Sequence, residues 1–114
     1  MKKIKIFLIA VFSVFIVSCE SNTYSEISAP AVNPTYVANV EPIIRHNCLS
    51  CHFGTNQSPN LETYDGVKNA CLNTNLICRI ESESCGERMP LGGRLAQSDI
   101  DLIKLWTTEG FVKE

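Results

Sequence analysis

The sequence predicts a small all-α domain of about three short helices joined by loops. Three stretches, 35–47, 61–70 and 98–109, carry apolar residues three and four positions apart, which is the spacing of one helix face. A C-x-x-C-H motif follows the first stretch, and the next eight residues, 53–60, are rich in turn-forming types. Residues 19–114 suffice for one small domain and not for two.

The first helix, residues 35–47, is expected to be irregular because Pro42 lies inside it. A proline removes one backbone donor and kinks or shortens a helix. The helix should run directly into the C-x-x-C-H motif. Its apolar face consists of Tyr36, Val37, Val40, Ile43 and Ile44.

The second helix, residues 61–70, has Thr63 as a candidate N-cap and is weakened by Gly66. Residues 72–87 have no clean period. Their apolar side chains fit a helical turn or an extended segment equally well, and the sequence does not decide between the two. These side chains are Leu76, Ile77 and Ile80.

The last helix is the best defined. Ser98 is the expected N-cap, with Asp101 three residues later completing a capping box, and Gly110 stands where a glycine stop belongs. Trp106 is expected to be a buried aromatic residue packed against the first helix. The broad apolar face consists of Ile100, Leu102, Ile103, Leu105 and Trp106.

The motif Cys48-Leu49-Ser50-Cys51-His52 has the residue order of c-type haem attachment. Two cysteines three positions apart can bond to one haem edge while the adjacent histidine ligates the iron. The alternatives are half of a zinc site or a thioredoxin-like redox pair. A zinc site needs a second ligand pair and a redox pair is expected beside a βαβ pattern, and neither companion is present. The motif therefore predicts one haem c, held by Cys48 and Cys51 with His52 on iron.

Met89 is the candidate for the second axial position of that iron. Met1 falls in the expected signal peptide, so Met89 is the one remaining thioether, and Pro90 fixes the backbone after it. A methionine that only fills a gap in the core is the alternative reading. His46 is the other candidate, but it stands two residues before Cys48 and is expected at the surface. No histidine, arginine or acid pair is expected where it could cleave a peroxide.

The N-terminus predicts a lipoprotein. Lys2, Lys3 and Lys5 precede an apolar run of about a dozen residues, which is shorter than the roughly 20 residues that span a bilayer. The run ends in Ile16-Val17-Ser18-Cys19, which resembles a bacterial lipobox. Residues 1–18 are therefore expected to be a lipoprotein signal peptide and 19–34 a lipidated tether. The chain from 35 to 114 is the domain, held at the cell envelope by acyl chains on Cys19, facing the periplasm or the exterior. Ordinary signal cleavage with Cys19 left free is the alternative.

The net charge of the chain without its signal peptide restricts the class of binding partner, and the three remaining cysteines limit the possible disulfides. Loss of the three signal lysines from the ten basic residues leaves seven against twelve acidic ones, a formal charge of −5, which disfavours nucleic acid and suits a basic or mixed-charge protein. Cys71, Cys78 and Cys85 cannot all pair with one another. A Cys78–Cys85 bridge is favoured and Cys71 is the odd thiol, although the spacing leaves the other pairings open.

The segments VEPIIRHNCLSCH, LETYDGVKNA and RMPLGGRLAQSDIDLIKLWTTEGF together resemble the small single-haem class I cytochrome c domains of bacterial lipoproteins and cell-surface proteins. The resemblance covers residues 36–111. It implies that His52 and Met89 are the axial ligands and that the helices carrying Val40 and Trp106 cross beside the haem edge. The three cysteines after residue 70 are less general in that family.

The resemblance implies a membrane-anchored electron carrier that cycles between Fe(II) and Fe(III). It would serve an unidentified redox protein and convert no small-molecule substrate, so it would not be an enzyme. Two alternatives are kept. One is a haem-based sensor or peroxidase-like domain in which Met89 is labile or absent from iron. The other is a non-haem interaction module whose cysteines bind zinc or pair as disulfides.

Overall fold

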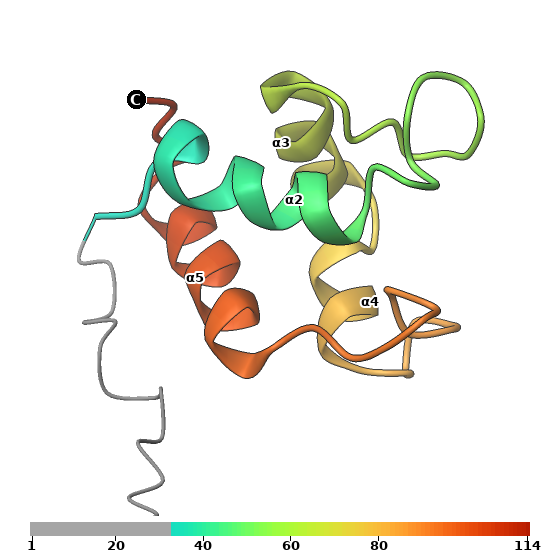
Figure 1. Cartoon of the computed structure of the whole chain (residues 1–114). Helices are drawn as coiled ribbons and strands as arrows, with labels where there is room; N and C mark the ends of the chain where they lie inside the picture. The colour runs from blue at the N-terminus through green and yellow to red at the C-terminus, as the bar shows by residue number, and fades with distance from the viewer. Residues whose placement is uncertain (1–32) are drawn as a thin grey trace, which may run out of the picture.

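The computed structural model describes residues 33–114, and these residues form helices and loops without a strand (Figure 1). The all-α prediction is therefore confirmed for the described part of the chain. The predicted signal peptide, Cys19 and nearly all of the predicted tether lie outside it. Within residues 33–114, no helix is both long enough and apolar enough to cross a membrane. The elements are η3 (Tyr36–Val40), α2 (Glu41–Asn47), α3 (Tyr64–Asn73), α4 (Leu76–Glu81) and α5 (Gln97–Thr108).

The first helix is irregular, as Pro42 predicts. A single turn of π-helix, η3, leads into the seven-residue α2, and Pro42 occupies the first turn of α2, where a missing N–H costs least. Thr35 caps the N-terminus of η3: its hydroxyl accepts a hydrogen bond from the Ala38 N–H at 3.3 Å. The helix therefore changes its winding just before the proline and then continues to the C-x-x-C-H motif.

The middle of the chain contains two helices where one was expected. Thr63 is the N-cap of α3, as predicted, and its hydroxyl accepts from the Gly66 N–H at 3.1 Å. The helix runs to Asn73, three residues beyond the predicted end. The open question over residues 72–87 is settled in favour of a helix, α4, whose buried side chains are Leu76 and Ile80.

The prediction that Ser98 caps the last helix is wrong. The N-cap of α5 is Ala96, whose carbonyl accepts from the N–H groups of Asp99 and Ile100, both at 3.1 Å. The helix has thus already begun at Ser98, and the expected box partner, Asp101, accepts instead from the side-chain amide of Gln97. The predicted glycine stop is confirmed, because the helix ends at Thr108 and Gly110 has a φ of +85°.

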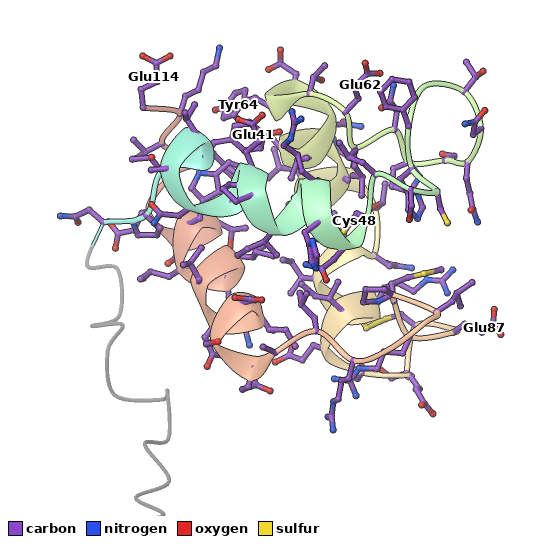
Figure 2. The ribbon with its side chains drawn as sticks, in the orientation of Figure 1. Glu41, Cys48, Glu62, Tyr64, Glu87 and Glu114 are labelled. Carbon is purple, nitrogen blue, oxygen red and sulfur yellow. A yellow bond between two sulfur atoms is a disulfide. The ribbon has the colours of Figure 1, made fainter. Side chains whose placement is uncertain are left out.

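Four aromatic rings form one end of the core, which we call the aromatic end: Tyr36, Tyr64, Trp106 and Phe111. Trp106 is fully buried, and the other three rings lie around it with centroids 4.9 to 6.1 Å away. Tyr64 and Glu114 lie together at this end of the molecule, opposite Glu87 (Figure 2). The expectation that Trp106 is buried against the first helix is confirmed.

Candidate functional site

A cavity of about 310 Å³ opens between α2, the loop after it, α4 and the segment around Met89. Its wall contains all four side chains predicted to hold and ligate a haem: Cys48, Cys51, His52 and Met89. The volume lies at the lower end of the range for small-molecule and cofactor sites. The rest of the wall is mainly apolar, and its apolar members are Ile43, Ile44, Pro59, Leu61, Leu76, Ile80, Pro90, Leu91, Leu95 and Ile103.

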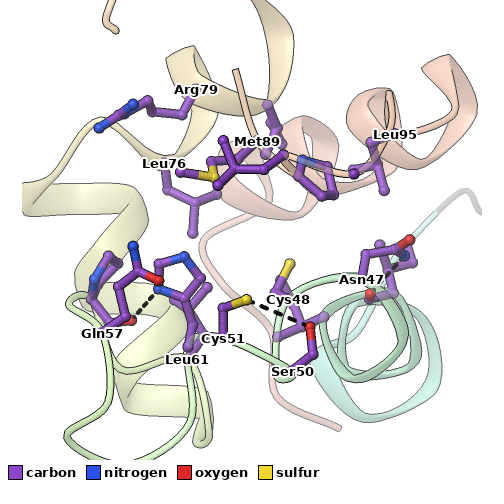
Figure 3. A pocket seen from close by; sticks show the side chains of 18 of the residues that line it. Asn47, Cys48, Ser50, Cys51, Gln57, Leu61, Leu76, Arg79, Met89 and Leu95 are labelled. Atoms are coloured by element: carbon purple, nitrogen blue, oxygen red, sulfur yellow. Dashed lines mark hydrogen bonds between the residues drawn. The ribbon is translucent and has the colours of Figure 1, made fainter. Parts of the chain in front are cut away.

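The motif turns away from the end of α2. Cys48 is the C-cap residue of that helix, and its N–H donates to the Ile44 carbonyl at 2.9 Å. The His52 N–H then donates back to the Cys48 carbonyl at 2.9 Å, which closes a turn over the motif. Both thiols consequently lie at the cavity, with Cys48 half-buried and Cys51 exposed (Figure 3).

The imidazole of His52 is held in one orientation. Its Nδ1 lies 2.9 Å from the carbonyl oxygen of Pro59. A carbonyl can only accept, so Nδ1 is the donor in this contact, which leaves Nε2 as the ring nitrogen available to a metal ion. The loop that supplies this carbonyl is closed by a hydrogen bond from the Leu61 N–H to the His52 carbonyl at 2.9 Å. Sequence reasoning did not find Pro59, because its carbonyl lies seven residues from the histidine it orients.

Met89 faces the motif from the opposite wall. It lies across the opening from Cys48 and Cys51 (Figure 3) and is half-buried. Its N–H donates to the carbonyl of Arg79, on α4, at 2.8 Å. The chain thus brings a thioether back to a cavity whose other wall carries an imidazole. Thioether and imidazole suit iron or copper, whereas Mg²⁺ and Ca²⁺ prefer oxygen ligands.

Arg79 also lines this wall, next to Met89. Sequence reasoning did not place an arginine at this cavity. Residues 72–87 gave no period from which to place this side chain. Its Nη1 donates to the Glu87 carbonyl at 2.7 Å, so part of its hydrogen-bonding capacity is used by the loop before Met89.

The structure contains a disulfide between Cys78 and Cys85, the pair favoured from the sequence. Cys71 is a free thiol on α3 and does not line the cavity. Burial raises the pKa of the Cys48 thiol to about 11 and that of Cys71 to about 12. The same burial disfavours the thiolate form of both groups in the protein without a metal ion.

Two other residues lie away from the cavity. His46 is exposed and does not line the cavity, in agreement with its expected surface position. Trp106 also does not line it. The helices that carry Val40 and Trp106 do contact each other, and Trp106 itself belongs to the aromatic end, whereas the α5 residue at the cavity wall is Ile103.

Within the described part of the chain, no three His, Cys, Asp or Glu side chains gather closely enough to hold a metal ion between them. The chain matches no known family model, no curated protein and no solved structure.

Proposed function

We propose that residues 35–114 form a small class I cytochrome c domain that carries single electrons. One haem c would be bound covalently through Cys48 and Cys51, with His52 and Met89 as axial ligands. The observation that carries the proposal is the meeting of these four side chains at one apolar cavity, although Met89 is far from the motif along the chain.

Each wall residue has a defined role in this proposal. His52 would ligate the iron through Nε2, because its Nδ1 is engaged by the Pro59 carbonyl. The Met89 thioether would favour the reduced state and raise the reduction potential. The apolar wall excludes water, which limits reorganisation on electron transfer. Haem supplies the one-electron couple when bound, and the protein supplies its position and surroundings.

The chain's anchoring is part of the proposal. Acyl chains on Cys19 would hold the domain at the bacterial cell envelope and raise its effective concentration near a membrane-associated redox protein. Replacing Cys19 (Cys19→Ser) should release the protein from membranes without changing its visible spectrum. A changed spectrum would show that this residue does more than attach lipid.

The test is a redox-poised visible spectrum of protein produced with haem-attachment machinery. The expected product is pigmented, with the pigment retained under denaturing conditions. His52→Ala should lose the six-coordinate spectrum, and His46→Ala is the matched control because these are the chain's two histidines. Cys48→Ser with Cys51→Ser should remove the covalent pigment, whereas Cys71→Ser should not. A colourless parent protein would overturn the proposal in favour of a non-haem module.

A haem-based sensor or peroxidase-like domain is the second candidate, and the position of Arg79 at the cavity is the observation that favours it. The two candidates differ in the sixth ligand. For the carrier, Met89→Ala should keep covalent haem, lower the potential and allow carbon monoxide to bind the reduced protein. Rapid carbon monoxide binding by the unmodified protein would favour the second candidate.

A further inference from the structure

Residues 78–89, which we call the Met89 clamp, contain the end of α4 and the loop that folds back on it. The disulfide between Cys78 and Cys85 joins the helix to this loop. Arg88 donates from Nε to the Ile80 carbonyl at 3.3 Å and from Nη2 to the Glu81 carbonyl, which satisfies carbonyls at the helix C-terminus.

Arg79 joins the clamp through both its backbone and its side chain. Its carbonyl accepts the Met89 N–H at 2.8 Å, and its guanidinium donates to the Glu87 carbonyl at 2.7 Å. These two bonds hold the backbone at Met89 and two residues before it. Arg79 and Met89 lie on the same side of the cavity opening (Figure 3).

Gly86 leaves the space that the Arg79 side chain needs. A Cβ atom built on Gly86 would lie 2.9 Å from Nη1 of Arg79 and 3.2 Å from its Cζ. Gly86 also has a φ of +110°, a conformation that suits glycine. The guanidinium therefore packs directly on the backbone of the turn, so the turn and the arginine fix each other's position.

We propose that Arg79 is a positioning residue for the Met89 sulfur: it holds the loop before Met89 against α4 so that the thioether stays at the cavity wall. The proposal rests on the proposed function for the use of the thioether. The holding itself is a property of residues 78–89 and does not depend on a bound cofactor. A ligand held in place beforehand loses less conformational entropy on binding than a ligand on a free loop.

The experiment compares Arg79→Ala with Arg94→Ala in the full chain. Both variants remove one positive charge near the Met89 loop, but Arg94 is exposed and does not line the cavity. The first measurement is the hydrogen-exchange rate of the Met89 amide by NMR on the reduced protein. Arg79→Ala should raise this rate about fivefold to tenfold, the effect of losing roughly one hydrogen bond, and Arg94→Ala should not.

The second measurement is the carbon monoxide affinity of the reduced holoprotein, together with the weak sulfur-to-iron band of the oxidised form. Arg79→Ala should raise the affinity about fivefold to tenfold and weaken the band, because it loosens the same loop. Arg79→Lys, which keeps the charge and one donor, should recover part of both signals. Equal effects of Arg79→Ala and Arg94→Ala would reduce Arg79 to a nearby charge and overturn the proposal.

Gly86→Ala should displace the guanidinium without removing it, and it also strains the turn, because a φ of +110° disfavours any side chain. It should accelerate exchange at Met89 in the parent and have less effect in Arg79→Ala, since the two changes act on one contact. Additive effects would overturn the proposal. A parent protein without haem would defeat the proposed function, while the exchange comparison would still decide whether Arg79 holds the loop.

Discussion

The two ends of the helical core are built differently. At the aromatic end, Trp106 is surrounded by three other rings, and its Nε1–H donates to the Val112 carbonyl at 2.8 Å. The Tyr64 hydroxyl donates to the Phe111 carbonyl at 2.8 Å. At the other end, the side chains of α2 and α4 face a cavity of about 310 Å³ instead of one another. Packing fills the first end, whereas the second encloses a cavity.

The two ends of the core also differ in the bonds that connect separate parts of the chain. The Tyr36 N–H donates to the Val112 carbonyl at 2.9 Å, so the start of the domain is tied to its last residues at the aromatic end. The cavity end is tied by the disulfide and by side chain to carbonyl bonds of Arg79 and Arg88. Both ends have buried apolar side chains, but the disulfide and the arginine bonds lie at the cavity end and the packed rings at the other, so perturbations should separate the two.

The largest effect should follow Trp106→Ala. Removing a fully buried indole leaves a cavity and removes one of the two hydrogen bonds that the Val112 carbonyl accepts, and the free energy of unfolding should fall by about 3 to 5 kcal/mol. Leu72→Ala is the matched control, since Leu72 is largely exposed and should cost about 0.5 kcal/mol or less. Denaturant unfolding followed by circular dichroism measures both. A loss below about 1 kcal/mol for Trp106→Ala would mean that the aromatic end does not carry the core.

Removing the proposed ligand should affect the cavity end selectively. In Cys48→Ser with Cys51→Ser, the Leu61 amide, bonded to the His52 carbonyl, should exchange on the order of a hundredfold faster. The Phe111 amide, bonded to the Trp106 carbonyl, should change much less. Hydrogen exchange with and without covalent haem provides the comparison. Equal acceleration at both amides would show that the two ends open as a single cooperative unit.

Removing the disulfide, which lies at the cavity end, should lower the free energy of unfolding by less than Trp106→Ala does. On the chain-entropy account, a loop of this length contributes about 2 to 3 kcal/mol, so Cys78→Ser with Cys85→Ser should lower the free energy of unfolding by about that amount. Cys71→Ala is the control, because Cys71 is a free thiol that does not line the cavity. A denaturant midpoint equal to that of the control would assign the stability of the clamp to the arginine bonds alone.

The sequence predicted correctly the features that depend on residues close together in the chain. A long apolar stripe, the Thr63 cap and the Gly110 stop each act within a few residues, and each is found in the structure. It also singled out four side chains that meet at one cavity, because the C-x-x-C-H motif and the lone thioether are distinctive in any context.

What the sequence missed depends on contacts that no short pattern records. The six-residue α4 is too short to show a helical period. Arg79 reaches Glu87 only because the chain folds back after α4, and Pro59 reaches His52 only because the intervening loop closes. The erroneous cap at Ser98 shows the limit of local reasoning, since a complete capping pattern was present two residues after the true N-cap, Ala96.

The smallest predicted effect distinguishes the true cap from the apparent one. Thr63→Ala removes the hydroxyl that accepts the Gly66 N–H and should lower the free energy of unfolding by about 1 kcal/mol. Ser98→Ala removes an exposed hydroxyl inside the first turn of α5, where alanine is the better helix former, so the change should be a few tenths of a kcal/mol at most. Both are measured by denaturant unfolding. A loss of about 1 kcal/mol for Ser98→Ala would mean that Ser98 caps α5 in solution.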